Sequence, residues 1–207
     1  MTTTTTLSPT DVLRHEHELI KKALAILSSM GQRIAGGGEV PRADVEGVLD
    51  FFKTFTDGCH HAKEEKALFP AMEAAGFPRD AGPIGVMLHE HELGRSFMGA
   101  MRDSVPTLSA PESRKRFVEA VEGYERLLSE HIEKENSVLF RMAEQVLAGD
   151  RIRAVAEAFE RHEQELGPGV HEKFHALVRE LSTRYDEARR PESLLPRSGC
   201  CGGGHCS

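Results

Sequence analysis

The 207-residue chain has no Trp, only two Tyr and four Cys, and its net charge of −7 leaves no excess of basic residues. This acidic balance gives no reason to expect a nucleic-acid or anionic-membrane partner. No apolar run approaches the roughly 20 residues of a membrane span. The Thr-rich N-terminus also lacks the basic start and apolar stretch of a secretory signal. We therefore expect a cytoplasmic protein that contacts neither nucleic acid nor membrane.

The alternating apolar pattern of β-strands is also missing, whereas apolar residues recur at helical spacing along most of the chain. This spacing predicts helices over about 12–31, 41–76, 84–101, 113–147 and 150–185, the last broken at 167–169. The inner stripe of the second helix is expected to pass through Val45, Leu49, Phe52, His60, Glu64, Ala67 and Ala71. The predicted fold is all-α: an up-and-down four-helix bundle with an additional C-terminal helix and a flexible Cys-rich tail. The corresponding regions are a flexible leader at 1–10, a domain at 11–188 (four-helix core 12–147, additional helical segment 150–188) and the tail at 189–207.

Eleven His residues are the compositional excess of the chain, and their placement repeats. The segment His15-Glu16-His17-Glu18-Leu19 recurs letter for letter at 89–93, and the segment 60–69 recurs loosely at 131–140. The repeat predicts two copies of one helix hairpin. Two such copies facing each other across a bundle axis would bring both sets of His and Glu side chains to one centre.

The chemistry of the repeat is that of a metal site. His60 and Glu64 are four residues apart, as are His131 and Glu135, so each pair lies on one helix face. His17 and His91 lie on the core faces of the first and third helices. Single buried histidines are commonly satisfied core residues, but six buried ionisable groups without partners would be costly. Four imidazoles and two carboxylates suit iron best, with manganese or zinc as alternatives.

These motifs resemble those of the hemerythrin-like, HHE cation-binding family over roughly residues 12–147. The matching segments are Glu16-His17, His60-x-x-x-Glu64 followed by Leu68-Phe69-Pro70, Glu90-His91, and His131-x-x-x-Glu135 followed by Leu139-Phe140. The resemblance implies a four-helix bundle with two iron ions in an oxo- or hydroxo-bridged non-haem centre that meets dioxygen. Its terminal ligands would be His17, His60, His91 and His131, and its bridging ligands Glu64 and Glu135.

The sequence departs from the oxygen-carrying hemerythrins on the third helix. Those proteins are expected to place two His one turn apart there, whereas Met87 and Arg95 flank His91 here. The fifth His is thus absent or supplied from elsewhere, and both ions would keep open positions. This favours reaction with dioxygen, peroxide or NO, in sensing, detoxification or oxidase-type chemistry, over reversible carriage. Whether the protein is an enzyme, which would make it a di-iron oxidoreductase, stays open.

Two other functions remain open. The tail residues Cys200, Cys201, His205 and Cys206 could bind or pass on metal or undergo redox chemistry, which suits iron storage, delivery or iron-centre repair with a metal or electron donor protein as partner. The segment His171-Glu172-x-x-His175 matches the signature of zinc metallopeptidases, which makes peptidase activity a remote alternative.

Several neighbours of the proposed ligands could support or extend the centre. Glu163 lies on an apolar stripe and could reach the metal directly or through water, with His162 beside it. Carboxylates commonly orient ligand imidazoles, and the residues placed to support the centre in this way or to add to it are His15, Glu16, His89 and Glu90. His61 and Glu65, one residue beyond His60 and Glu64, are expected to point outward or to bond locally.

Overall fold

The structure is a computed structural model that describes residues 7–185. Most of the predicted leader and all of the Cys tail, with Cys200, Cys201, His205 and Cys206, lie outside the described residues. Within 7–185 the chain is helical with short connections and has no strand, which confirms the all-α prediction. The elements are α1 (Pro9–Ala35), α2 (Arg42–Phe51), η1 (Phe52–His61), η2 (Glu64–Leu68), α3 (Phe69–Glu73), α4 (Gly82–Ser104), η3 (Val105–Thr107), α5 (Pro111–Lys134), η4 (Glu135–Leu139), α6 (Phe140–Val146), α7 (Asp150–Leu166) and α8 (Val170–Tyr185).

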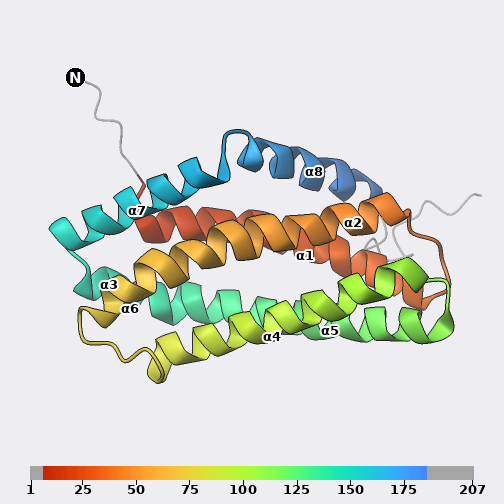
Figure 1. Cartoon of the computed structure of the whole chain (residues 1–207), viewed down its shortest axis with the longest axis horizontal. Helices are drawn as coiled ribbons and strands as arrows, with labels where there is room; N and C mark the ends of the chain where they lie inside the picture. Colours follow the sequence, from red (N-terminus) through yellow and green to blue (C-terminus); the bar gives the residue numbers. More distant parts are fainter. Residues whose placement is uncertain (1–6, 186–207) are drawn as a thin grey trace, which may run out of the picture.

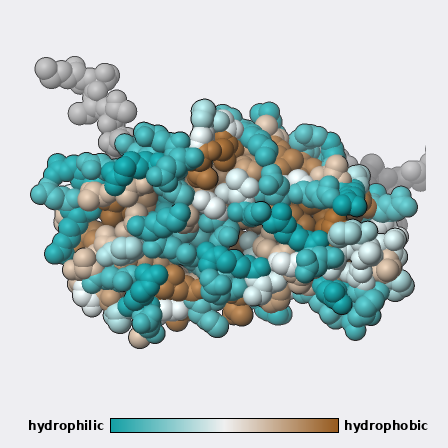
Figure 2. All heavy atoms as spheres, in the orientation of Figure 1, coloured by the Kyte–Doolittle hydropathy of each residue, from teal (hydrophilic) through white to brown (hydrophobic). Residues whose placement is uncertain are grey.

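Long helical segments lie side by side as a bundle, with α7 and α8 running along one side of it (Figure 1). Hydrophilic residues cover most of the face drawn in Figure 2, with smaller hydrophobic patches between them. None of the helices in the described part combines the length and the apolar content that crossing a membrane would need.

The first helix begins where the sequence predicts but ends later. Ser8 caps it by accepting a hydrogen bond from the Asp11 backbone N–H at 3.2 Å. The predicted end at Gly31 is wrong, because α1 continues to Ala35. Gly31 has a packing role instead: a Cβ atom there would lie 2.9 Å from Cγ1 of Val121 on α5. Glycine therefore permits a close approach of α1 to α5, and the helix ends at the glycines that follow Ala35.

The second long segment is continuous from α2 to α3 but is π-helical over η1 and η2. A π-helix bonds residue i to i+5, so each turn holds more residues than an α-helical turn. Core positions accordingly recur every four residues at Phe52, Thr56, His60, Glu64, Leu68 and Met72. The expected continuation of the inner stripe through Ala67 and Ala71 is wrong, because both are only partly buried.

Two apolar clusters fill the bundle, and the buried His and Glu side chains lie between them along each helix. On α5 and η4, for example, Leu128 belongs to one cluster and Leu139 to the other, with His131 and Glu135 between them. Helix α8 completes the first cluster, since Phe174 is fully buried and its ring meets that of Phe51 edge-on.

Candidate metal centre

Two groups of potential ligands meet in the middle of the bundle. One consists of His17, His60, Glu64 and Glu135, and the other of His61, Glu64, His91 and His131; within each group the ligand atoms lie within 4.8 Å of one another. All of these side chains are buried. We call His17 and His60 the His60 half of the centre, and His61, His91 and His131 the His91 half.

The two carboxylates face both halves. Glu135 places one oxygen 3.1 Å from Nε2 of His17 and the other 3.2 Å from Nε2 of His131. Glu64 places one oxygen 3.7 Å from Nε2 of His60 and the other 3.5 Å from Nε2 of His91. Each carboxylate therefore presents one oxygen to each half, which is the arrangement of a group that bridges two adjacent ions.

Hydrogen bonds from Nδ1 fix the orientation of four imidazoles and leave Nε2 turned toward the centre. His60 donates to Glu16 at 2.9 Å, and His131 donates to Glu90 at 3.0 Å. Such outer partners set the tautomer of a metal-binding imidazole and raise its basicity. The sequence placed Glu16 and Glu90 beside the centre, and the structure shows that each orients an imidazole on another helix of its own hairpin.

The remaining two imidazoles are oriented by residues that sequence analysis did not assign to the centre. His91 donates to Glu65 at 2.7 Å, and His17 donates to Asn136 at 3.0 Å. The expectation that Glu65 points outward or bonds locally is therefore wrong. Glu65 and Asn136 occupy equivalent positions in the two copies of the repeat, so the hydrogen-bonding scheme repeats while one carboxylate is replaced by an amide.

His61 is the main difference between sequence expectation and structure. It is 5% exposed rather than outward-facing, and its ring stacks on that of His91 with centroids 3.8 Å apart. Its equivalent in the second copy of the repeat is Ile132, an apolar residue that is also buried. That apolar counterpart is the sequence signal that position 61 faces inward. A fifth buried imidazole thus lies next to His60 in the sequence, and among the described residues it belongs to the His91 half.

The pKa shifts at the centre show that the buried carboxylates favour additional positive charge beside them. Burial and the neighbouring Glu135 carboxylate raise the pKa of Glu64 well above its ordinary value. Burial lowers the pKa of His131, but Glu135 and Glu90 outweigh it and raise that pKa to about 9. Without a metal, a proton on His131 therefore balances the charge of the Glu135 carboxylate beside it, and the centre disfavours a second negative charge on Glu64.

The residues fit a pair of metal ions. All four oxygens of Glu64 and Glu135, and both ring nitrogens of His61, are buried without a hydrogen-bond partner among the described residues. Buried polar atoms nearly always have a partner, so these six atoms are the expected signature of coordinating groups. Imidazole nitrogens and carboxylate oxygens are the donor set that iron accepts.

Glu163 lies away from both ligand groups. It contacts the ammonium group of Lys63, whose buried side chain also donates to Glu16 at 2.5 Å. Burial lowers the pKa of Lys63, but Glu16 and the other neighbouring acceptors outweigh it and raise that pKa. Within the described residues Glu163 is thus connected to the centre through Lys63, Glu16 and His60, and it also lies 4.0 Å from Nε2 of His171. Cys59 is buried beside these contacts, and its sulfur lies 3.6 Å from Nε2 of His171.

The other histidines singled out by the sequence lie outside the two ligand groups. His15 is exposed and bonds to the Asp11 carbonyl at 2.8 Å, His89 is exposed, and His162 donates to the Gly58 carbonyl at 2.9 Å. His175 is exposed and belongs to no cluster of potential ligands within residues 7–185. The described part of the chain therefore gives no zinc site built on His171 and His175.

Comparison with protein families and curated proteins agrees with this geometry. The model of the family described as hemerythrin HHE cation-binding domain matches residues 8–143. An uncharacterized protein of Mycobacterium bovis is 25% identical over 158 residues, which are 75% of this chain and 61% of that protein. The chain thus covers about three fifths of the length of this relative.

Two further relatives carry functional names. The iron-sulfur cluster repair protein YtfE of Edwardsiella ictaluri is 32% identical over 140 residues, which are 64% of this chain and 62% of that protein. The iron-sulfur cluster repair protein DnrN of Neisseria gonorrhoeae is 33% identical over 85 residues, 39% of this chain and 54% of that protein. No solved structure matches the chain significantly.

Proposed function

Because the chain belongs to the hemerythrin family of HHE cation-binding domains, we propose that it holds two iron ions in a four-helix up-and-down bundle and reacts with dioxygen, peroxide or NO. The observation that carries the proposal is the pair of carboxylates, Glu64 and Glu135, each with one oxygen toward each half of the centre. The ligands would be His17, His60, His91 and His131, with His61 as a fifth imidazole.

Bound iron would supply electrons and open coordination positions to a small oxidant. The residues of the chain determine where that happens. Glu16, Glu90, Glu65 and Asn136 hold the imidazoles in one tautomer with Nε2 inward. The two apolar clusters enclose the centre and limit access of water. The unequal number of imidazoles makes the two halves chemically different, with two imidazoles in the His60 half and three in the His91 half.

The first test is the iron content of the anaerobically purified chain. We expect about two iron ions per chain, as in other two-metal sites, and their loss in His60→Ala/His131→Ala. The matched control is His15→Ala/His89→Ala, which removes two imidazoles from equivalent places in the repeat but outside the ligand groups. Retention of a single zinc ion by the His60→Ala/His131→Ala variant would contradict the di-iron proposal.

Reactivity is tested on the iron-loaded chain by following the consumption of dioxygen, peroxide or NO. Turnover by the wild-type chain and its absence in His60→Ala/His131→Ala are expected. A stable oxygenated spectrum that forms and disappears reversibly over many cycles would instead indicate carriage.

Iron-centre repair or iron delivery is the second candidate, favoured by the names of the relatives from Edwardsiella ictaluri and Neisseria gonorrhoeae. In this function Cys200, Cys201 and Cys206 would take part in transfer. The full chain with all three replaced by Ser should then keep its iron but lose transfer to an iron-free acceptor protein. Unchanged transfer by that variant, together with undiminished consumption of oxidant, would leave only the first function.

A further inference from the structure

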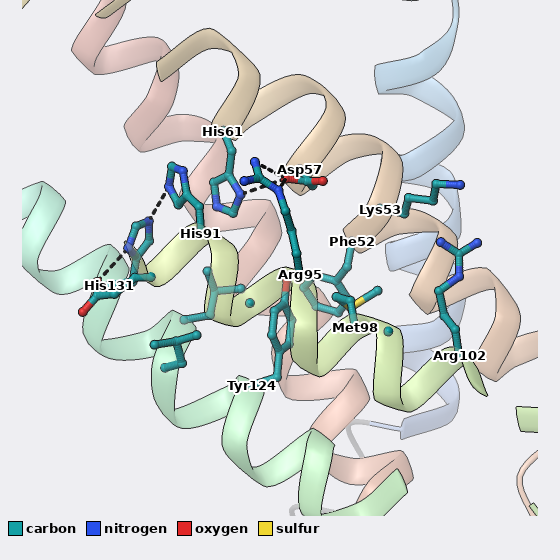
Figure 3. A pocket seen from close by; sticks show the side chains of 15 residues that line it. Phe52, Lys53, Asp57, His61, His91, Arg95, Met98, Arg102, Tyr124 and His131 are labelled. Atoms are coloured by element: carbon teal, nitrogen blue, oxygen red, sulfur yellow. Dashed lines mark hydrogen bonds and ion pairs between the residues drawn. The ribbon is translucent and has the colours of Figure 1, made fainter. Parts of the chain in front are cut away.

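A cavity lies against the His91 half of the centre, between η1, α4 and α5 (Figure 3). Its volume is about 230 Å³, and His61, His91 and His131 lie at its inner end. A single water molecule needs only about 10–15 Å³ of such space. The cavity is therefore many times larger than dioxygen or NO requires, and its size matches a small organic molecule.

The walls of the cavity are apolar. The buried side chains of Phe52, Met98, Tyr124 and Leu128 line it. Part of the room comes from Gly99 on α4, because a Cβ atom at that position would meet no heavy atom within 4 Å. These walls favour an apolar ligand body, since burying such a body releases water from both surfaces.

The opposite end of the cavity carries unpaired positive charge. Lys53 on η1 and Arg102 on α4 lie together at the end away from the histidines (Figure 3). Both are exposed, and neither has an ion pair or hydrogen bond with another described residue. Arg95, which also lines the cavity, is already neutralised by Asp57 at 2.8 Å and Glu65 at 2.7 Å. In a chain of net charge −7, two unpaired cations at one cavity mouth favour an anionic group.

The inner end presents a buried imidazole whose polar contact among the described residues is an ion pair of His61 Nδ1 with Asp57 at 3.6 Å. His61 is 95% buried, and both of its ring nitrogens lack a hydrogen bond within the described residues. Its ring stacks on that of His91, and both rings line the cavity. A molecule that fills the cavity therefore ends beside His61, at the edge of the metal centre.

We propose that this cavity binds a small organic acid, with its carboxylate between Lys53 and Arg102 and its apolar body directed toward the His91 half. That the acid is a substrate of the iron centre rests on the function proposed above. Binding of the acid does not need the metal, so the two proposals can fail separately.

The experiment measures binding of octanoate, and of octanol as its uncharged counterpart, to the full metal-free chain by isothermal titration calorimetry. Saturable binding of octanoate and weaker binding of octanol are expected. Lys53→Glu/Arg102→Glu should weaken octanoate binding about tenfold, because two exposed ion pairs contribute about 1.4 kcal/mol together. Lys66→Glu/Arg116→Glu makes the same change of charge at exposed positions outside the cavity and should bind octanoate like the wild type.

A second variant tests the cavity itself. Gly99→Leu places a side chain in the empty space and should abolish binding while the chain stays folded, since Leu has a higher helix propensity than Gly. Circular dichroism and the melting temperature check the fold. Undiminished octanoate binding by Gly99→Leu or by Lys53→Glu/Arg102→Glu would overturn the proposal, as would equal affinity for octanol or no binding at all. Octanoate binding by a chain that takes up no iron would overturn the iron function and leave the cavity assignment intact.

Discussion

Glu16 and Glu90 occupy equivalent places in the two copies of the repeat but have different surroundings. Glu16 and its partner Lys63 are buried, with 6% and 0% of their side chains exposed. Glu90 is 12% exposed and its partner Lys134 is 39% exposed. The same pair of residues is therefore enclosed by protein in one hairpin and reaches solvent in the other.

Replacing each glutamate by glutamine should lower the free energy of unfolding by different amounts in the two hairpins. Glu16→Gln leaves a buried ammonium group with Glu163 alone, and we expect it to lower the free energy of unfolding of the metal-free chain by about 2–3 kcal/mol. Glu90→Gln should cost about 1 kcal/mol or less. Urea unfolding of the two variants is the measurement, and equal losses would contradict the assignment of Lys63 as a buried partner.

Binding of metal should release protons at neutral pH. In the metal-free chain the pKa of His131 is raised to about 9, so this imidazole holds a proton at neutral pH. Burial and the neighbouring Glu135 raise the pKa of Glu64 as well. Ligands must lose their protons to coordinate, so the release of about one proton from His131 is expected when the His91 half binds a metal ion. Calorimetric titrations in buffers of different ionisation enthalpy count the protons released.

The same raised pKa gives a pH dependence of stability without metal. Because the folded-state pKa of His131 lies above its ordinary value of 6.5, protonated His131 stabilises the metal-free chain fully below that pH. This contribution is lost as the pH rises through about 9. Unfolding measured across this range should show the decline in the wild-type chain and not in His131→Gln. An equal decline in both would assign it to another group.

At the scale of a helix, the spacing of the His and Glu residues predicted that most of the side chains of the candidate centre lie together, because this spacing follows the helical repeat. Residues four apart share a face in either an α- or a π-helix, so the pairing of His60 with Glu64 and of His131 with Glu135 did not depend on which helix forms. The inward position of His61 was not predicted. The residue after an inward-facing His was expected to point aside, yet the equivalent residue of the α-helical α5, Ile132, is buried as well. At this level the buried face of both segments is therefore wide enough for two neighbouring residues.

Replacing two helical glycines by alanine is predicted to change the free energy of unfolding in opposite directions. Gly31→Ala places a Cβ atom 2.9 Å from Cγ1 of Val121, a stiff and buried side chain, and should lower the free energy of unfolding by about 1–3 kcal/mol. Gly99→Ala meets no atom within 4 Å and should raise it by about 0.5–1 kcal/mol. Thermal unfolding of the two variants compares them directly; the absence of a loss in Gly31→Ala would show that α1 and α5 can separate at little cost.

At the scale of the whole molecule, the hydrophobic core extends beyond the part that the family model matches. That match ends at residue 143, yet α8 contributes Phe174, Val178, Leu181 and Tyr185 to the core, and Tyr185 donates to Asp44 of α2 at 2.7 Å. The sequence predicted a helical segment here from its apolar spacing. Its place against α1 and α2 could not be read from that spacing, because many helix faces could receive an apolar stripe.

Phe174→Ala tests whether α8 is integral to the bundle. Loss of a fully buried phenyl ring should lower the free energy of unfolding by about 3–5 kcal/mol. His175→Ala, a change to the next residue on the exposed side of α8, should stay within about 0.5 kcal/mol of the wild type. A small effect of Phe174→Ala would mean that α8 is an appendage rather than part of the core.

Because the two hairpins are parts of one chain, they need not be identical, unlike the subunits of a symmetric dimer. A dimer of two identical hairpins would carry a two-fold axis through the ligand cluster, and every residue on one side would have an identical mate on the other. Such an assembly must offer the same surroundings to both ions. Covalent fusion removes that constraint: His61 in one copy can correspond to Ile132 in the other, and Glu65 to Asn136, because each position is encoded separately. In the di-iron centre proposed above, the single chain can therefore give the two ions different surroundings.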